Sequence, residues 1–195
     1  MKEFLKQVSD KETKILLEIA ESSLKVEGDF VELGCYRWET SVLLEKLLEK
    51  QGSEKKLWIY DSFEGLPKKT AEDASVAGDA FKEKELLVSK REVVERFKRA
   101  RLKLPIIKKG FFENLDPEKD LPREIAFAFL DGDLYNSIKT SLKLVAPKLA
   151  KGGVMVVHDY NNPELPGSAR AVDEFLRART EFRLRIFETL AILSR

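Results

Sequence analysis

Short apolar runs alternate along the chain with longer segments in which apolar residues recur every three or four positions. The short runs predict strands over residues 29–33, 57–61, 105–109, 125–131 and 154–159. The periodic segments predict helices over residues 9–26, 40–50, 89–100 and 169–179, and over a stretch that follows residue 131 and ends near 149. Ser9 with Glu12, and Ser89 with Glu92, have the spacing of capping boxes and mark two helix starts.

The alternation of strands and helices predicts an α/β fold with a mostly parallel sheet. Residues 125–131 and 154–159 are apolar at nearly every position, which is typical of strands that are buried on both faces by helices. Gly152–Gly153 is interpreted as the break between a helix and the strand that follows. The last residues, FRLRIFETLAILSR, predict two close strands that form an antiparallel hairpin at the end of the sheet.

Composition narrows the class of protein. The 195 residues include 35 Lys+Arg and 34 Asp+Glu, and this balance disfavours a nucleic-acid partner, which usually demands a basic excess. One cysteine and one histidine exclude an internal disulfide and the usual zinc sites. Because we find neither a signal peptide nor an apolar run of membrane-spanning length, we expect one soluble, cytoplasmic domain over residues 1–195 that has no membrane partner.

In a parallel α/β sheet, ligands bind beyond the carboxyl ends of the strands, so the residues there are the first candidates for a site. Gly34 follows the first strand, and a glycine there allows the backbone to approach a ligand closely. Asp61 ends the second strand, where an acid can hold ribose hydroxyls or simply form a solvated strand end or helix cap. The segment VELGCYRWETS lacks the G-x-G-x-x-G turn that binds pyrophosphate, which favours S-adenosylmethionine over a nicotinamide cofactor.

A second group of polar residues follows the fourth and fifth strands. Asp131 and Asp133 come after the fourth strand, and His158 with Asp159 after the fifth. If these strands are neighbours, their side chains can share a divalent cation. The alternative is that Asp133 caps the next helix while His158 and Asp159 bond to backbone groups. Burial of these groups without partners would be costly, so a cation or hydrogen bonds must compensate.

Several segments in the same order resemble the macrocin O-methyltransferase (TylF-type) family. They run from GDFVELGCYRWETSVLLEKLL through IYDSFEGLP, GDAFKEKELLVSKREVVERF and KKGFFENL to FLDGDLYNSIKTSLKLVAPKLAKGGVMVVHDY and PGSARAVDEF, and so cover most of the chain between residues 28 and 175. YDSFEGLP and LDGDLY are the most specific of them. The resemblance implies the Rossmann-like class I methyltransferase fold, S-adenosylmethionine as methyl donor, Mg²⁺ as the usual cation, and a hydroxyl of a small molecule such as a sugar or phenol as acceptor.

The resemblance also assigns roles to individual residues, carried over by position. It places the cofactor against Glu32, Gly34, Asp61, Ser62 and Gly110. It makes Asp133 the general base and Asp131 a metal ligand, and it makes His158 and Asp159 candidate ligands. His158 stands where the family usually has aspartate, and imidazole suits Mn²⁺, Fe²⁺ or Zn²⁺ better than Mg²⁺.

Other interpretations remain open from the sequence. Trp38-Glu39 stands where the family usually has Gly-Gly, so Trp38 either crowds the cofactor loop or packs beside it. One alternative function is a metal-independent methyltransferase acting on another atom. Another is a cofactor-binding protein without catalysis, because Trp38-Glu39 and His158 alter two family signatures. Cys35 near His158 is a weaker candidate, as a nucleophile. Residues 65–88 are charged and weakly patterned, typical of either a lid or a solvated loop, and a homo-oligomer is an open alternative.

Overall fold

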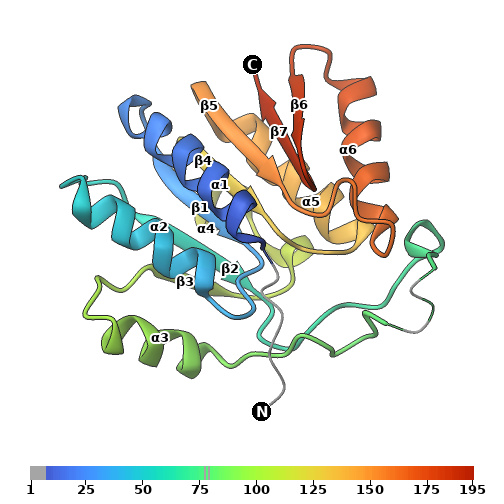
Figure 1. Ribbon diagram of the computed structural model, residues 1–195, viewed down its shortest axis with the longest axis horizontal. Helices are drawn as coiled ribbons and strands as arrows, with labels where there is room; N and C mark the ends of the chain where they lie inside the picture. Colours follow the sequence, from blue (N-terminus) through green and yellow to red (C-terminus); the bar gives the residue numbers. More distant parts are fainter. Residues whose placement is uncertain (1–7, 77, 79) are drawn as a thin grey trace.

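The computed structural model describes residues 8–76, 78 and 80–195, which form helices around one seven-stranded sheet (Figure 1). The order across the sheet is β3-β2-β1-β4-β5-β7-β6. Strands β1 to β5 pair in parallel, while β7 pairs antiparallel with both β5 and β6. The predicted parallel sheet with a C-terminal hairpin is therefore confirmed. The strands are β1 (Asp29–Leu33), β2 (Leu57–Asp61), β3 (Ile106–Lys109), β4 (Ile125–Leu130), β5 (Leu149–Val157), β6 (Arg183–Phe187) and β7 (Leu190–Ser194).

The strand order reverses between β1 and β4, and this places the site. The chain moves outward from β1 to β2 and β3, and then returns to the other side of β1 as β4 and β5. At such a reversal the loops leave in opposite directions and open a crevice beyond the carboxyl ends of the strands. The fourth and fifth strands are neighbours, which is the condition for a cation shared between their ends, and Leu130 pairs with Val157 there.

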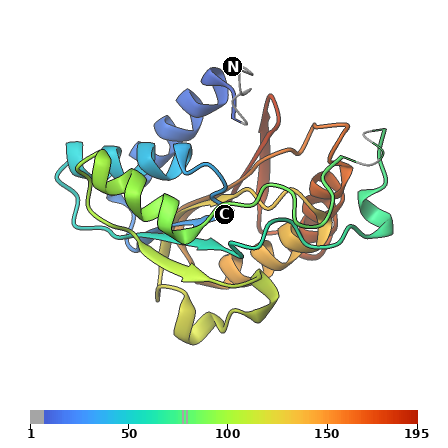
Figure 2. The same ribbon diagram turned by 90° about the horizontal axis from the view of Figure 1, so that it is seen from below.

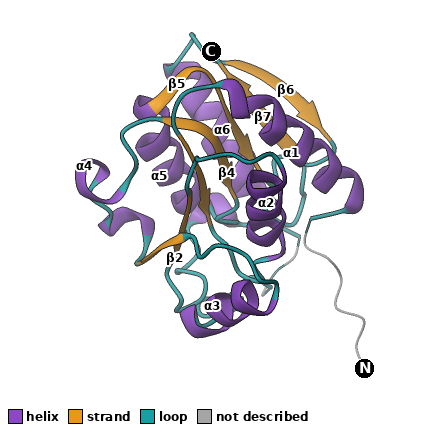
Figure 3. Cartoon of the chain, turned by 90° about the vertical axis from the view of Figure 1, so that its left-hand side faces the viewer, coloured by secondary structure: helices purple, strands orange, loops and turns teal. Residues whose placement is uncertain are grey.

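Helices cover both faces of the sheet, as Figures 2 and 3 show. Side chains alternate in direction along each strand, so Phe30 and Phe127 belong to one buried cluster and Val31 and Ala128 to the other. Among the described residues no helix is long and apolar enough to cross a membrane. The first face is covered by α1 (Asp10–Ser22), α2 (Glu39–Lys50) and α3 (Lys90–Arg99), and the second by α5 (Tyr135–Val145) and α6 (Pro166–Ala178), with the short α4 (Pro117–Asp120) beside them.

The boundaries differ from prediction around the fifth strand. The preceding helix ends at Val145, a 3-10 turn covers Ala146–Lys148, and the strand already begins at Leu149. Gly152–Gly153 is therefore inside β5, where the register shifts opposite Ile125, and its interpretation as a break was wrong. A Cβ on Gly153 would lie 2.9 Å from the Ile125 carbonyl oxygen, so glycine permits this irregular pairing.

The helix predicted for residues 9–26 begins with the expected capping box but ends earlier, at Ser22; residues 1–7 of the predicted N-terminal segment lie outside the described residues. The side chain of Glu12 is buried and accepts hydrogen bonds from Thr189 as well as from Ser9. The Thr189 backbone nitrogen and hydroxyl lie 3.0 and 2.6 Å from Oε1 of Glu12. One carboxylate therefore joins the first helix to the turn between β6 and β7.

We expect Glu12→Gln to lower the free energy of unfolding at pH 7 by on the order of 2 kcal/mol. Burial opposes ionisation of Glu12, but the hydrogen bonds from Thr189 and Ser9 lower its pKa from 4.5 to about 2. The ionised carboxylate stabilises the fold above pH 4.5, and this contribution is lost as the pH falls toward 2. Denaturant unfolding at several pH values should show the gap between the two proteins closing below pH 4.5. Glu18→Gln, which removes an exposed pair with Lys14 on the same helix, should change little at any pH.

Candidate functional site

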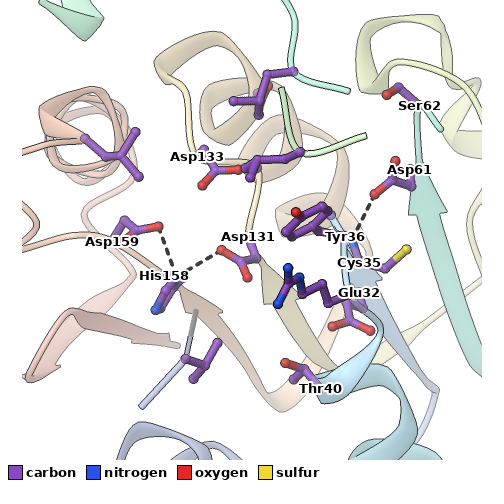
Figure 4. A pocket seen from close by; sticks show the side chains of 18 of the residues that line it. Glu32, Cys35, Tyr36, Thr40, Asp61, Ser62, Asp131, Asp133, His158 and Asp159 are labelled. Atoms are coloured by element: carbon purple, nitrogen blue, oxygen red, sulfur yellow. Dashed lines mark hydrogen bonds and ion pairs between the residues drawn. The ribbon is translucent and has the colours of Figure 1, made fainter. Parts of the chain in front are cut away.

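A pocket of about 650 Å³ opens at the carboxyl ends of the parallel strands (Figure 4). Its walls come from the residues that follow β1 to β5, from the start of α1 and from the segment between β2 and α3. This volume is typical of a small-molecule site. Eight of the nine predicted site residues line it: Glu32, Gly34, Asp61, Ser62, Asp131, Asp133, His158 and Asp159.

Gly110 is the predicted residue that does not line the pocket. Its backbone nitrogen donates a hydrogen bond to the Asp61 carbonyl oxygen at 2.9 Å, which extends the pairing of β2 with β3. The next residues, Phe111, Phe112 and Glu113, line the pocket instead. Sequence reasoning missed them, although their position directly after a strand is the same signal that identified the other candidates.

Gly34 is required by the neighbouring backbone. Its φ is +93°, and a Cβ there would lie 2.0 Å from the Asp131 carbonyl oxygen. The ends of β1 and β4 therefore approach so closely that a side chain cannot fit between them. We predicted a close approach to a ligand, and the structure shows a close approach to the strand that carries Asp131.

Asp61 connects two of the loops that form the pocket. Its carboxylate accepts hydrogen bonds from the backbone nitrogens of Cys35, at 3.0 Å, and Phe63, at 2.8 Å. The hydroxyl of Ser62 donates to the Gly65 carbonyl oxygen at 2.9 Å and so shapes the same turn. These contacts give Asp61 a structural role. Each carboxylate oxygen retains capacity for a further hydrogen bond, so ribose binding stays a prediction.

Glu32 lines the pocket with a side chain that is almost wholly buried. The side chain is 1% exposed and accepts a hydrogen bond from the Ser41 hydroxyl, which ties β1 to α2. Burial raises the pKa of Glu32 to about 8, and the nearby charges of Asp131 and Asp61 act in the same direction. At neutral pH this carboxyl is therefore mainly protonated, and it can donate a hydrogen bond into the pocket region.

Asp131, His158 and Asp159 converge on one side of the pocket, across from Asp61 and Ser62 (Figure 4). Nδ1 of His158 is 3.0 Å from Oδ1 of Asp131 and 3.0 Å from Oδ2 of Asp159. Burial disfavours the imidazolium, yet the two carboxylates raise the pKa of His158 well above its usual value. The predicted cluster is therefore brought together, and His158 pairs with side chains rather than with backbone groups.

The triad fits a divalent cation. Its three ligand atoms lie within 4.8 Å of one another. Nδ1 of His158 lies 3.0 Å from each of the two carboxylates, so a cation bound through this nitrogen would replace the proton that these ion pairs hold. Two carboxylates and one imidazole suit Mn²⁺, Fe²⁺ or Zn²⁺, and Mg²⁺ less well.

Asp133 lies two residues after Asp131, in the loop that follows β4, and its side chain points into the pocket (Figure 4). Its φ is +59°, and the Ser168 hydroxyl donates to its carbonyl oxygen at 3.1 Å. The N-cap residue of α5 is Leu134, so the alternative that Asp133 caps this helix is wrong. Burial raises the pKa of Asp133, and the charges of Asp131 and Asp159 raise it further, which makes this carboxylate a stronger base than a free one.

Cys35 and Trp38, both in the loop after β1, each had two possible roles, and their surroundings in the structure bear on the choice. Burial raises the pKa of the Cys35 thiol far above its usual range, with the Asp61 and Glu32 charges adding to it, so the nucleophile hypothesis is disfavoured. Trp38 lines the pocket and also packs against the core under α1 and α2. Its φ of +58° suits the glycine usual in the family better than a bulky residue.

Part of the segment between β2 and α3 covers the pocket. Figure 1 shows this segment crossing to α6 and returning to α3. Leu66 packs against Leu134 and Leu165, and its backbone exchanges hydrogen bonds with residues 84 and 85 of the returning strand of chain. The pocket residues that it supplies are Gly65, Leu66, Pro67, Phe81 and Leu86. These residues cover the pocket, and the choice between a lid and a solvated loop over 65–88 stays a prediction.

The chain matches the model of the macrocin O-methyltransferase (TylF) family over residues 8–186. It is 31% identical over 141 residues to an enzyme of Streptomyces olivaceus named 8-demethyl-8-(2,3-dimethoxy-alpha-L-rhamnosyl)-tetracenomycin-C 4'-O-methyltransferase, and this match covers 69% of the chain and 54% of the relative. It is 32% identical over 158 residues to demethyldecarbamoylnovobiocin O-methyltransferase of Streptomyces niveus, a match that covers 77% of the chain and 58% of the relative.

A solved structure agrees with these matches. The structure of the O-methyltransferase NovP superimposes with a TM-score of 0.80 and 27% identity, over 95% of this chain and 79% of that one. The chain spans little more than half the length of the two curated relatives. The family match nevertheless includes every strand through β5 and all eight site residues that line the pocket, so the chain belongs to the macrocin O-methyltransferase family and has the class I methyltransferase fold.

Proposed function

We propose that this chain carries the catalytic site of an S-adenosylmethionine-dependent O-methyltransferase that acts on a hydroxyl group of a small molecule with the help of a divalent cation. One observation carries the proposal. A single pocket places Asp61, at the end of β2, opposite the triad of Asp131, His158 and Asp159, with Asp133 beside the triad. A methyl donor held at one end of this pocket would face an acceptor oxygen at the other.

The end of the pocket near β2 and β3 suits the methyl donor, S-adenosylmethionine. Asp61 and Ser62 would face the ribose, and Phe111 and Phe112 offer aromatic surface for adenine. Arg37, on the loop after β1, is the single lysine or arginine among the described residues that line the pocket. A guanidinium there would bind the carboxylate of the methionine part.

We assign to Asp133 the role of the general base, which accepts the proton of the acceptor hydroxyl. The acceptor oxygen attacks the sulfonium methyl group, the C–S bond breaks, S-adenosylhomocysteine leaves, and the hydroxyl proton passes to Asp133. An alcohol has a pKa near that of water, ~15.7, whereas a free aspartic acid has ~3.9, so Asp133 alone does not deprotonate the hydroxyl before the methyl group is attacked. A divalent cation held by Asp131, His158 and Asp159 would lower the pKa of a nearby hydroxyl and so reduce this pKa difference.

The cofactor half of the proposal is tested by calorimetric titration with S-adenosylhomocysteine. We expect binding by the wild-type chain and at least a 10-fold weaker affinity for Asp61→Ala, because the carboxylate both supports the β1 loop and faces the ribose. Methyl transfer from labelled S-adenosylmethionine to a panel of p-nitrophenyl glycosides, with Mn²⁺ or with a chelator, then tests the reaction. Absence of cofactor binding would sink the methyltransferase proposal, and transfer that survives chelation would remove the cation from it.

The charges of the pocket indicate an acceptor without phosphate groups. Arg37 and His158 are the basic side chains among the described residues of its lining, acidic side chains outnumber them, and Leu66, Phe81 and Leu165 add apolar surface. The S. olivaceus relative is named for a rhamnosyl-tetracenomycin acceptor, which agrees with a neutral glycoside. We therefore propose that the methyl acceptor is an uncharged, partly apolar glycoside. The carboxylates are Asp10, Glu32, Glu39, Asp61, Glu113, Asp131, Asp133, Asp159 and Glu164.

We expect Glu164→Lys to strengthen binding of a nucleoside diphosphate sugar by about 10-fold, because two like charges ~8 Å apart repel by about 0.5–2 kcal/mol and the substitution reverses the sign. Glu164 is exposed at the pocket rim, so the fold should tolerate the change. Glu124→Lys, at the amino end of β4, is the matched control and should change nothing. Tighter binding of a nucleotide sugar than of the p-nitrophenyl glycoside by the wild-type chain would contradict the assignment.

A further inference from the structure

Asp73 is a buried carboxylate in the pocket-covering segment, outside the pocket itself. It ends a 3-10 turn (Ala71–Asp73) and is 3% exposed. Its Oδ2 accepts hydrogen bonds from the backbone nitrogen and hydroxyl of Thr70, at 2.9 and 3.0 Å. Its Oδ1 accepts a hydrogen bond from the backbone nitrogen of Tyr135 at 2.7 Å. One side chain thus joins the cover to a residue 62 positions later in the chain.

Tyr135 is the first residue of α5, and its N–H group is one of those that a helix cannot satisfy internally. The N-cap residue, Leu134, has no side-chain cap bond. Asp73 therefore supplies the missing cap from another part of the chain, and its negative charge also suits the positive end of the helix dipole. The loop from Asp131 to Leu134, which carries the proposed base, ends at this capped position.

The surrounding structure is built around this contact. A Cβ on Gly167, in the first turn of α6, would lie 2.1 Å from Oδ1 of Asp73, so the glycine leaves room for the carboxylate. The next residue, Ser168, holds the carbonyl oxygen of Asp133. The Arg170 guanidinium donates to the carbonyl oxygens of residues 71 and 72. The cover, α5 and α6 therefore meet at the two peptide groups on either side of Leu134, directly after Asp133.

We infer that Asp73 is a positioning residue, which docks the pocket cover onto the start of α5 and thereby holds Asp133 in its left-handed backbone conformation. The role rests on the proposed function, because it acts through the proposed base. A non-glycine residue with φ of +59° persists only where its surroundings hold it. Three hydrogen bonds do so here: the Leu134 nitrogen donates to the Gly132 carbonyl oxygen across Asp133, the Ser168 hydroxyl donates to the Asp133 carbonyl oxygen, and the Tyr135 nitrogen, two residues beyond, donates to Asp73. Loss of Asp73 should therefore affect turnover more than cofactor binding.

The first test compares Asp73→Ala with Glu83→Ala, an exposed position of the same segment. We expect Asp73→Ala to speed hydrogen–deuterium exchange at least 10-fold in peptides covering 62–89 and 131–137, with strands β1 and β2 unchanged. The affinity for S-adenosylhomocysteine should stay within 2-fold. In labelled methyl transfer to the p-nitrophenyl glycosides, kcat should fall at least 10-fold. Glu83→Ala should match the wild type in all three measurements.

Asp73→Asn provides a second variant, because its amide oxygen can still accept the hydrogen bond from the Tyr135 nitrogen that Asp73→Ala removes. It should keep most of the exchange protection in 131–137 and most of kcat. Unchanged exchange in 131–137 for Asp73→Ala, or losses in Asp73→Asn as large as those in Asp73→Ala, would overturn the inference. The exchange measurement needs no methyl transfer, so a failed methyltransferase proposal and a failed role for Asp73 remain distinguishable.

Discussion

We expect Asp133→Asn to lower the rate of methyl transfer by about 10²–10⁴-fold, the range that a positioned general base contributes. Asparagine has nearly the same volume as aspartate and also tolerates a left-handed backbone, so the loop should keep its conformation. What is lost is the one group at this position that can accept the hydroxyl proton. The measurement is labelled methyl transfer to the glycoside panel under saturating cofactor.

Cofactor binding separates this effect from a folding defect. Titration with S-adenosylhomocysteine should give the same affinity for Asp133→Asn as for the wild type, because Asp61 and the loop after β1 are untouched. Asp116→Asn is the matched control, since Asp116 lies outside the pocket and asparagine can still cap α4. Full turnover by Asp133→Asn would remove this residue from the mechanism and leave the proton to solvent or another group.

Gly34→Ala should lower the free energy of unfolding by more than about 4 kcal/mol, the size of effect reserved for gross steric conflict. The new Cβ would lie 2.0 Å from the Asp131 carbonyl oxygen. The Cβ position is fixed by the backbone at residue 34, and the oxygen is itself a backbone atom, so neither can rotate away. β1 and β4 would have to separate at their carboxyl ends, where the pocket lies. Denaturant unfolding measures the loss, and S-adenosylhomocysteine titration should show that cofactor binding is lost with it.

Gly52→Ala controls for backbone conformation alone. Gly52 also has a positive φ, +59°, yet nothing lies within 4 Å of the added Cβ. We expect a cost of about 1–2 kcal/mol from the left-handed conformation, without loss of cofactor binding. If the two substitutions cost the same, the close approach of β1 to β4 would not be the reason for glycine at position 34.

The strands and most of the site could be predicted from local sequence because both depend on short-range pattern. A run such as residues 125–130 is buried on both faces, so each of its positions is apolar and the pattern is unambiguous. Parallel strands end at one edge, so Asp61, Asp131 and His158 could be expected to meet there. The resemblance to a known family then supplied the roles that position alone left open.

The features that could not be predicted join residues far apart in the chain. Nothing around Asp73 indicates that it caps a helix 62 residues later, and nothing around Glu12 indicates its bond to Thr189. Gly152–Gly153 was misread because a glycine pair breaks a helix and permits an irregular strand equally well, and only the register against Ile125 decides between them. Such choices are made by tertiary packing.

The position of β7 bears on how the chain folds as it leaves the ribosome. β7 pairs with β5 on one side and β6 on the other, so one edge of β5 has no partner until residues 190–194 have been synthesised. Glu12 likewise waits for Thr189, 177 positions later in the chain. The nascent sheet therefore presents an open, apolar edge from the synthesis of β5 until β7 has followed it, and such edges invite aggregation. We expect the final residues of the hairpin, rather than any earlier helix, to complete the cooperative fold.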